Sequence, residues 1–328
     1  MDVNQSITTY TDIFETLKKQ LRWKVSGNQL LMTIASTYLT GENTFDSERF
    51  LVIADEIKAQ SKPFSIWRSP SRFGIAAVLD AHFDDAAEQI RQLFQVYDQM
   101  TAAKFHRGPF TCIAAATLLM QGKNEDIDTD VIIARAKRIY KDMKDEHILL
   151  TSSQDYPMAI SLACQNKEDI IQEAEQHYQR LHLHGFRKGN DLQFLSHILA
   201  LGHPYSGQSL VSNTADVFDA FKGIDLKPKP SYYPFIGMLA LLPDVEQHVQ
   251  MVKELYSKLR MQKHFKWQKD MNIMLAAGLV VKDQLKDRSI VDASLFTIME
   301  SVLQAQQAAM TAAAVSSAAA AQNNSGSN

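Results

Sequence analysis

A period of roughly 40 residues runs along most of this chain and constrains its fold more than any other feature. In each copy, an amphipathic stretch is followed by a short loop and then by an apolar stretch rich in small residues. One aromatic or large aliphatic residue recurs near the same place in each amphipathic stretch: Leu17, Ile57, Tyr97, Tyr140, Tyr178, Phe221 and Tyr256. A fixed period of this length is typical of arrays of helix pairs.

The copy that begins at Asp84 shows the pattern of one helix pair. Apolar residues fall on one helical face in its first stretch: Ile90, Leu93, Phe94, Tyr97 and Met100. Gly108 and Pro109 then interrupt the helix and permit a new start. The next stretch, FTCIAAATLLMQG, is apolar nearly all round, so we expect it to pack on both sides. We name the first helix of each pair the outer helix and the second the inner helix.

These patterns predict an all-α fold, a HEAT- or armadillo-like αα-repeat solenoid of about six to seven helix pairs. The helical-repeat domain would span residues 1–310, with a division into two halves near residue 124 as an option. The stretch RSIVDASLFTIMESVLQAQQAAM predicts a C-terminal capping helix. Residues 311–328 are rich in alanine and then polar, which predicts a partly disordered tail.

Bulk properties exclude several classes of protein. A net charge of −3 and a pI near 6.4 argue against a dedicated nucleic-acid binder, so we expect no nucleic-acid partner. The chain has no apolar run of about 18 residues, and its N-terminus lacks the features of a signal peptide. We therefore expect a cytoplasmic protein with no membrane partner. Cys112 and Cys164 lack a zinc-like spacing, and no metal site or cofactor is predicted.

Charge is segregated between two kinds of loop. The loops inside the helix pairs are basic: Lys62, Arg68, Arg72, Lys104, His106, Arg107, Arg187, Lys188, Lys222, Lys227, Lys229, Arg260, Lys263, His264 and Lys266. The junctions between pairs are acidic: Asp80, Asp84, Asp85, Glu125, Asp126, Asp128, Asp130, Glu168, Asp169, Asp244, Glu246 and Asp283. Stacked pairs would place the two kinds of loop on opposite edges. Complementation of helix dipoles explains this segregation most simply, and an anion-binding basic edge is the alternative.

Eight residues of the basic loops are our candidate binding residues: Trp67, Arg68, Arg72, His106, Arg107, Arg187, Lys188 and Trp267. An aromatic ring beside a cation can stack a ligand, but it can also plug the end of a helix pair. Phe105 and Phe186 each follow their repeat Tyr by eight positions, which favours the plug. For the tryptophans, both interpretations stay open.

The loop IWRSPSR, Ile66 to Arg72, is the sharpest local candidate for a site. Its two arginines and two serines could hold a carboxylate or phosphate. A simpler interpretation is that Ser69, Pro70 and Ser71 start the next helix as capping residues.

Motifs of known catalytic chemistry are missing from the sequence, so no catalytic residue is predicted. The chain has no P-loop, no dinucleotide-binding glycine motif and no Gly-x-Ser-x-Gly elbow. His177, His182 and His184 are badly spaced for a metal. His197 lies in an apolar inner stretch, where a histidine usually belongs to the core.

Three segments together resemble a known family: FSIWRSPSRFGIAAVLD near residue 64, LQFLSHILALG at 192–202, and the tail QAQQAAMTAAA. The chain resembles a domain-of-unknown-function family of Gram-positive bacteria over nearly its whole length. The resemblance implies a bacterial cytoplasmic setting. It implies no activity and no functional residues.

The function is unknown from sequence, and two main hypotheses from different classes follow, with nucleic-acid binding along the basic edge as a weaker third. The first is a non-enzymatic scaffold that binds a protein or peptide partner, with an acidic or phosphorylated ligand as an option. The alternative is an α/α-toroid-like enzyme with a pocket lined by inner helices, for which Asp80 and His197 are among the few polar inner residues.

Overall fold

The computed structural model describes residues 2–25, 27–63, 65–123, 127–165, 167–202, 209–224 and 226–286. These residues form fourteen α-helices and three short 3-10 helices, and they contain no strand, so the all-α prediction is confirmed. The chain divides into two compact units, and the boundary falls inside helix α7. We name them the N-terminal unit, Asp2–Ile133, and the C-terminal unit, which runs from Ala134 to the last described residue.

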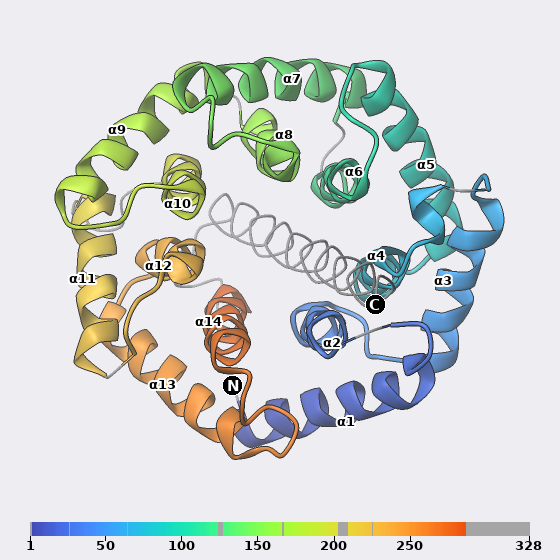
Figure 1. Ribbon diagram of the computed structural model, residues 1–328, viewed down its shortest axis with the longest axis horizontal. Helices are drawn as coiled ribbons and strands as arrows, with labels where there is room; N and C mark the ends of the chain where they lie inside the picture. Colours follow the sequence, from blue (N-terminus) through green and yellow to red (C-terminus); the bar gives the residue numbers. More distant parts are fainter. Residues whose placement is uncertain are drawn as a thin grey trace, which may run out of the picture. The chain divides into compact units, whose positions relative to one another are not determined.

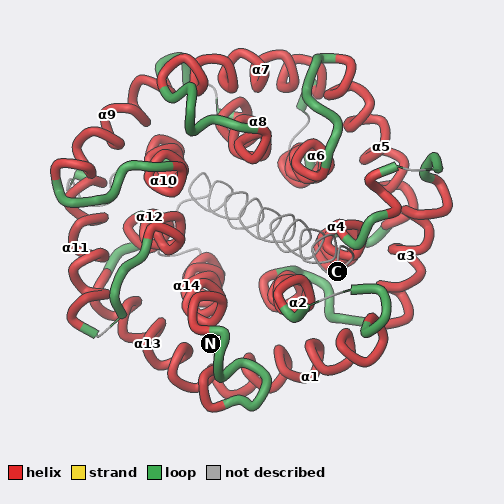
Figure 2. The backbone as a smooth tube through the Cα atoms, in the orientation of Figure 1, coloured by secondary structure: helices red, strands yellow, loops and turns green. Residues whose placement is uncertain are grey.

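The N-terminal unit consists of three helix pairs (Figure 1). Its outer helices are α1 (Val3–Leu21), α3 (Ser47–Gln60) and α5 (Ala86–Ala102). Its inner helices are α2 (Gln29–Thr40), α4 (Ser71–His82) and α6 (Pro109–Gln121), and the 3-10 helix η1 (Ile66–Arg68) precedes α4. Each outer helix packs on the inner helix that follows it, and α4 packs between α2 and α6. Figure 2 shows the loops that join the members of each pair.

The C-terminal unit repeats this arrangement. Its outer helices are α7 (Thr129–Glu146), α9 (Ile170–Leu183), α11 (Leu210–Gly223) and α13 (Val245–Met261). Its inner helices are α8 (Tyr156–Cys164), α10 (Asn190–Leu201), α12 (Tyr233–Ala240) and α14 (Lys269–Lys286), with 3-10 helices η2 (Ser153–Asp155) and η3 (Pro230–Tyr232). Along the inner layer, α12 packs between α10 and α14, and α10 also contacts α8.

Burial distinguishes the two layers as the hydrophobic patterns predict. Every residue of the inner helix α4 is buried, whereas the outer helix α5 buries only one face. Small residues let inner helices approach closely. A Cβ atom added to Gly237 of α12 would lie 3.3 Å from the Leu195 side chain of α10. The glycine thus marks a close helix–helix contact, which is what the small-residue pattern of the inner helices predicts.

The recurrent tyrosine of the outer helix holds the following loop. Tyr178 is buried, and its hydroxyl accepts a hydrogen bond from the Gly189 N–H at 3.3 Å. The Tyr97 hydroxyl is hydrogen-bonded to the backbone of Gly108, again eleven positions further along the chain. Both glycines are the N-cap residues of the inner helices that follow. The two pairs therefore share one device, in which the outer helix fixes the start of its inner partner.

A second shared device ends the outer helices α5 and α9. Lys104 and Gly185 have positive φ angles, 67° and 90°, and each follows its repeat tyrosine by seven positions. The next residues, Phe105 and Phe186, donate their backbone N–H groups five positions back, to the carbonyls of Met100 and Leu181: this is the Schellman motif. Both phenylalanine rings are buried. Their prediction as plugs is therefore confirmed.

Some sequence predictions lie outside the described residues. They include the capping helix between residues 288 and 310, the tail 311–328, and the acidic residues Glu125 and Asp126. Among the helices of the described ranges, none combines the length and the apolar character that crossing a membrane requires.

Candidate functional site

Trp67 is part of the core of the N-terminal unit. Only 4% of the residue is exposed, and its ring lies 4.8 Å from Phe94 and 5.1 Å from Tyr97, measured between centroids. Tyr97 also holds Gly108 of the next loop. The Trp67 ring therefore packs against α5 of the next helix pair, and Tyr97 brings the loop before α4 beside the loop before α6.

The two arginines of the Ile66–Arg72 loop have different environments. Arg72 is buried, and its Nη1 donates to the carbonyls of Arg68 and Ser69, both at 3.2 Å. Its guanidinium lies 4.2 Å from the Phe73 ring centroid, and burial lowers its pKa. Arg68 is exposed and donates to the Ser61 carbonyl at 3.3 Å. Arg72 thus holds the loop together, whereas the Arg68 side chain faces solvent.

The capping interpretation of this loop is correct about where the helix begins. Helix α4 starts at Ser71, with Pro70 at the N-cap position and no side-chain capping bond. The Ser69 and Ser71 hydroxyls instead bond to each other at 2.5 Å. The serines are therefore satisfied locally at the start of the helix.

His106 and Arg107 are exposed in the loop between Phe105 and Gly108. Both ends of this loop are fixed, by the Schellman motif and by the Tyr97 hydroxyl. Because Tyr97 also contacts Trp67, the structure brings Arg68, His106 and Arg107 to neighbouring loops on one edge of the unit. We name these three residues the N-terminal basic edge.

Arg187 and Lys188 occupy the equivalent loop of the C-terminal unit, and both are exposed. The Arg187 N–H donates to the Tyr233 hydroxyl at 3.0 Å. The neighbouring Phe186 ring packs on Phe218 and Tyr233, with centroid distances of 4.4 and 5.0 Å. The backbone of this loop is thus fixed on α11 and α12, and its charged side chains project outward.

Trp267 differs from Trp67, although both were candidates. Trp267 is 80% exposed, and the Lys266 ammonium lies 5.2 Å from its ring centroid. Trp23 is also exposed, with the Arg22 guanidinium 4.4 Å from its ring. Trp67 is therefore a buried core residue, whereas the Trp23 and Trp267 rings are exposed, and the stacking of a ligand on these two stays a prediction.

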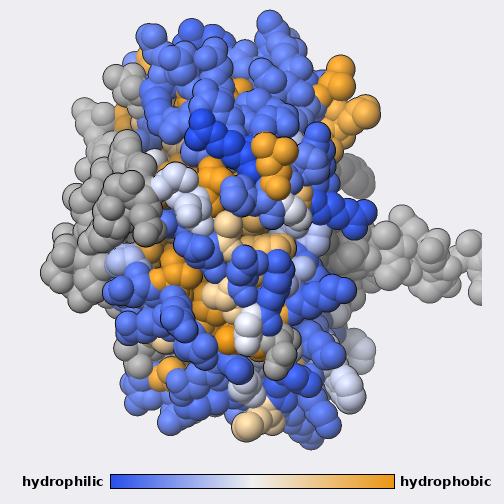
Figure 3. All heavy atoms as spheres, turned by 90° about the vertical axis from the view of Figure 1, so that its left-hand side faces the viewer, coloured by the Kyte–Doolittle hydropathy of each residue, from blue (hydrophilic) through white to orange (hydrophobic). Residues whose placement is uncertain are grey.

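The loop edge of the C-terminal unit also carries large apolar side chains that sequence reasoning missed. The most exposed are Leu149 at 93% and Leu183 at 84%, and Ile148, Met261 and Trp267 belong to the same group. In Figure 3, apolar groups protrude at the upper right of a largely hydrophilic surface, and other apolar groups lie across its middle. Leu183 is the last residue of α9, where helical periodicity alone predicts an ordinary boundary residue. The available signal was an apolar residue inside the predicted loop HLHGFRKGND, which begins at His182.

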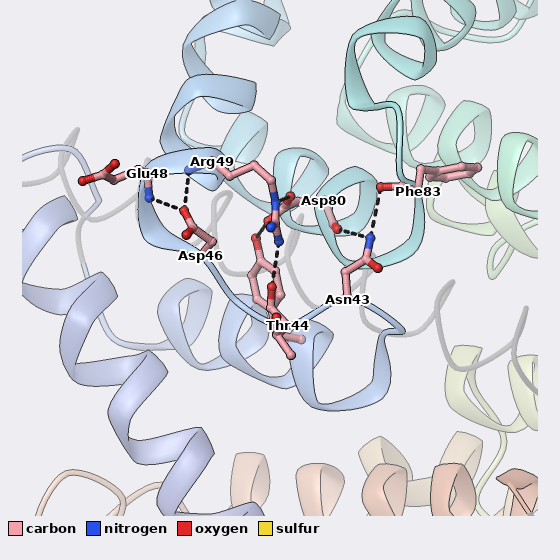
Figure 4. A network of polar contacts seen from close by, with 8 residues as sticks. Asn43, Thr44, Asp46, Glu48, Arg49, Asp80 and Phe83 are labelled. Carbon is pink, nitrogen blue, oxygen red and sulfur yellow. Dashed lines mark hydrogen bonds and ion pairs between the residues drawn. The ribbon is translucent and has the colours of Figure 1, made fainter.

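A network of polar contacts lies near the acidic junction between α4 and α5 in the N-terminal unit (Figure 4). Asp80, at the end of the buried helix α4, accepts from the Tyr38 hydroxyl at 2.8 Å and pairs with the Arg49 guanidinium. Arg49 also donates to the Thr44 carbonyl at 2.7 Å, and the Asn43 amide donates to the Asp80 carbonyl at 3.0 Å. Three helices and one loop are thus joined at one buried residue, through its carboxylate and its backbone carbonyl.

Sequence reasoning singled out Asp80 but missed Arg49, Tyr38 and Asn43. The signal was indirect: a carboxylate in an apolar inner helix requires a cation or several donors. The sequence does not show which residue provides them, because Arg49 is 31 positions away.

A cavity of about 410 Å³ borders this network between α3 and α5. Its walls include Arg49, Ile53, Asp80, Phe83 and Ile90. Both carboxylate oxygens of Asp80 are occupied by protein donors, so a ligand here would meet apolar walls, the exposed side of Arg49 and the acidic residues Glu56 and Asp84. His197 is fully buried in the C-terminal unit, and burial lowers its pKa to about 3. Within the described residues, no cluster of three or more His, Cys, Asp or Glu side chains could hold a metal.

Comparison with known proteins identifies the family. The family model described as "Protein of unknown function (DUF4003)" matches residues 13–308. An uncharacterised protein, YeaA of Bacillus subtilis (strain 168), is 35% identical over 313 residues, which is 95% of this chain and 94% of the relative. No solved structure matches the chain. The resemblance to a domain-of-unknown-function family of Gram-positive bacteria is thus confirmed, and the function is unknown, as that resemblance implies. Because the family model covers most of its length, the chain belongs to the DUF4003 family.

Proposed function

We propose that this protein is a non-enzymatic scaffold that binds an acidic protein or peptide segment on the N-terminal basic edge. One observation carries the proposal. Arg68, His106 and Arg107 are exposed on two neighbouring loops whose backbones are fixed by buried aromatic rings. A fixed backbone presents its cations at low entropic cost, which favours recognition of carboxylates.

We also propose that the helix pairs form an αα-repeat solenoid of the HEAT or armadillo kind. Support comes from the repetition of detailed contacts. Outer-helix tyrosine, loop phenylalanine and N-cap glycine recur with the same spacings in the pairs α5–α6 and α9–α10. Repeat scaffolds commonly serve as extended surfaces for partner proteins. We place the protein in the bacterial cytoplasm.

The charge of the N-terminal basic edge favours an acidic segment. Arg107 forms no ion pair with an acidic side chain in the described part of the chain, and Arg68 bonds only a carbonyl oxygen there. A guanidinium can bind a carboxylate or phosphate through two parallel hydrogen bonds. A phosphorylated segment would therefore bind through the same groups, whereas the net charge of −3 of the chain disfavours a nucleic acid.

Binding of labelled peptides tests the proposal. A panel of fluorescein-labelled acidic peptides, with and without phosphoserine, is titrated with the protein, and the anisotropy is measured at low and high salt. We expect the double variant Arg68→Glu/Arg107→Glu to weaken binding at least about tenfold with an unchanged melting temperature.

Arg91→Glu is the matched control, because Arg91 is an exposed cation in the middle of α5. We expect this variant to retain binding within about twofold. The proposal fails if no peptide of the panel binds, or if the double variant and the control bind equally well.

The enzyme alternative remains a prediction. Asp80 borders the cavity of about 410 Å³, as that hypothesis requires, but its carboxylate is fully engaged by Tyr38 and Arg49. His197 does not line the cavity beside Asp80 or the one between α11 and α13. The contacts of Asp80 and the burial of His197 support a structural role for each residue.

A further inference from the structure

Three loops at one edge of the C-terminal unit present large apolar side chains to solvent. Leu149 lies in the α7–α8 loop, Leu183 at the end of α9, and Met261 and Trp267 at the two ends of the α13–α14 loop. We name these four residues the apolar tips. Single exposed apolar residues are common on protein surfaces, but recurrence on three loops of one edge marks an interaction surface.

Contacts between successive loops place them side by side. The Gln193 amide of α10 donates to the Thr151 hydroxyl of the α7–α8 loop at 2.9 Å. Arg187 of the α9–α10 loop bonds Tyr233 of α12. Lys229 of the α11–α12 loop forms an ion pair with Asp270 of α14 at 2.7 Å. This series of contacts runs from α7 to α14, so the apolar tips belong to one edge.

Exposed cations lie between the apolar tips: Arg187, Lys188, Lys227, Lys263 and Lys266. The acidic side chains nearby do not neutralise the positive charge of these cations. Asp270 is engaged by Lys229 and the Tyr232 hydroxyl, and Asp191 is half buried. Asp145 and Glu146 precede the Leu149 loop, which therefore adds apolar surface without positive charge. The edge from α9 to α14 is thus both apolar and basic.

We propose that this edge docks the protein on an anionic membrane surface. Highly exposed tips protrude from the protein, whereas a peptide partner is usually bound in a groove. The cavity found between α11 and α13 is lined by none of the four tips. The interfacial region of a bilayer accepts protruding Trp, Leu and Met side chains, and its anionic headgroups attract Lys and Arg.

Docking of this kind needs no membrane-spanning helix. The sequence led us to expect no membrane partner because no segment could cross a bilayer, but that criterion does not test attachment to the surface. The residues involved are separate from the N-terminal basic edge, so this proposal and the proposed peptide binding can fail independently.

Vesicle binding of the full chain tests the proposal. Flotation is measured with phosphatidylcholine vesicles that contain about one third phosphatidylglycerol, and with vesicles of phosphatidylcholine alone. We expect binding to the anionic vesicles and loss of binding at high salt. Leu183→Ala/Trp267→Ala should lower the partition coefficient at least about tenfold, and Arg187→Glu/Lys188→Glu should have a similar effect.

Two control variants test whether the loss of vesicle binding is specific to substitutions on this edge. Val52→Ala removes an exposed apolar side chain of α3, and Lys253→Glu reverses an exposed charge in the middle of α13. Both should bind like the wild type. In a Trp23→Phe background, Trp267 is the exposed tryptophan of the described residues, and its fluorescence should shift to shorter wavelength on anionic vesicles.

Three outcomes would overturn the proposal. The first is no flotation of the wild type with anionic vesicles. The second is equal flotation of the two edge variants and the controls. The third is a concentration-dependent dimer that Leu183→Ala/Trp267→Ala dissociates, since the edge would then bind a second copy of the chain.

Discussion

Two tryptophans in corresponding loops of the two units have opposite environments. Trp67 packs against Phe94 and Tyr97 inside the N-terminal unit, whereas Trp267 stands in solvent beside Lys266 in the C-terminal unit. The other exposed apolar groups follow the same division. Leu149, Leu183 and Met261 lie on loops of the C-terminal unit, and the N-terminal unit has only Trp23 at its described loop edge.

The difference shows that similar helix pairs can present different surfaces. Both units bury the recurrent aromatic of the outer helix and a loop phenylalanine, because these rings complete the end of a helix pair. The residues beyond those rings have no such role. In the N-terminal unit they are mainly cations, and in the C-terminal unit cations alternate with apolar tips.

The largest expected effect concerns the two tryptophans. Trp67→Ala should lower the free energy of unfolding by about 3–5 kcal/mol, because it removes a buried ring and leaves a cavity. Trp267→Ala should change it by less than about 0.5 kcal/mol, because its ring is exposed. Urea denaturation followed by circular dichroism measures both. Similar losses for the two variants would contradict the difference between the loops.

Acidification should lower the free energy of unfolding through the buried histidine of the C-terminal unit. Burial lowers the pKa of His197 from 6.5 to about 3, so the folded chain binds fewer protons here than the unfolded chain. Stability from this group is complete above about pH 6.5 and is lost progressively as the pH falls toward 3, by about 2–4 kcal/mol.

The Asp155 carboxyl opposes this effect, because burial raises its pKa to about 6. In the folded chain this carboxyl keeps its proton up to a higher pH than in the unfolded chain. Its contribution to the free energy of unfolding therefore falls as the pH rises from about 4 to 6. Comparison of wild type with His197→Gln, by urea denaturation at a series of pH values, isolates the histidine. An identical pH dependence of the two proteins would refute the assignment.

The hydroxyls of Tyr97 and Tyr178 should contribute equally to the free energy of unfolding. Tyr97→Phe and Tyr178→Phe each remove the partner of a backbone group at Gly108 or Gly189 while the ring remains. We expect each to cost about 1 kcal/mol of unfolding free energy. A cost in only one unit, measured by denaturant titration, would show that the shared device has different importance in the two.

The smallest expected effects have opposite signs at corresponding positions. Gly185→Ala places a Cβ on a residue with φ of 90°, where no other atom lies near, so backbone strain alone should cost about 0.5–1 kcal/mol. Lys104→Gly relieves the same strain at φ of 67° and should be neutral or stabilise by up to about 0.5 kcal/mol. Thermal unfolding of both variants decides this, and a melting temperature raised by Gly185→Ala would contradict it.

Most of the helices could be predicted, but the partners of polar residues could not. The positions of α5 and α6 follow from the spacing of Ile90, Leu93 and Tyr97 and from the break at Gly108. The pairing of Asp80 with Arg49 depends on how α3 packs against α4, which no local pattern encodes. Lys104 at positive φ was likewise missed, because glycine is the usual signal for that position.

By itself, the sequence determined the all-α class, the order of outer and inner helices, and the segregation of charge between loops. These properties depend on periodicity and on local chain geometry, which neighbouring residues determine. Only the tertiary structure decided that Trp67 and Arg72 are buried while Arg107, Leu183 and Trp267 are exposed. The exposure of a loop residue depends on which distant helices pack beside it, and contacts such as that of Trp67 with Phe94 form only when the helix pairs come together.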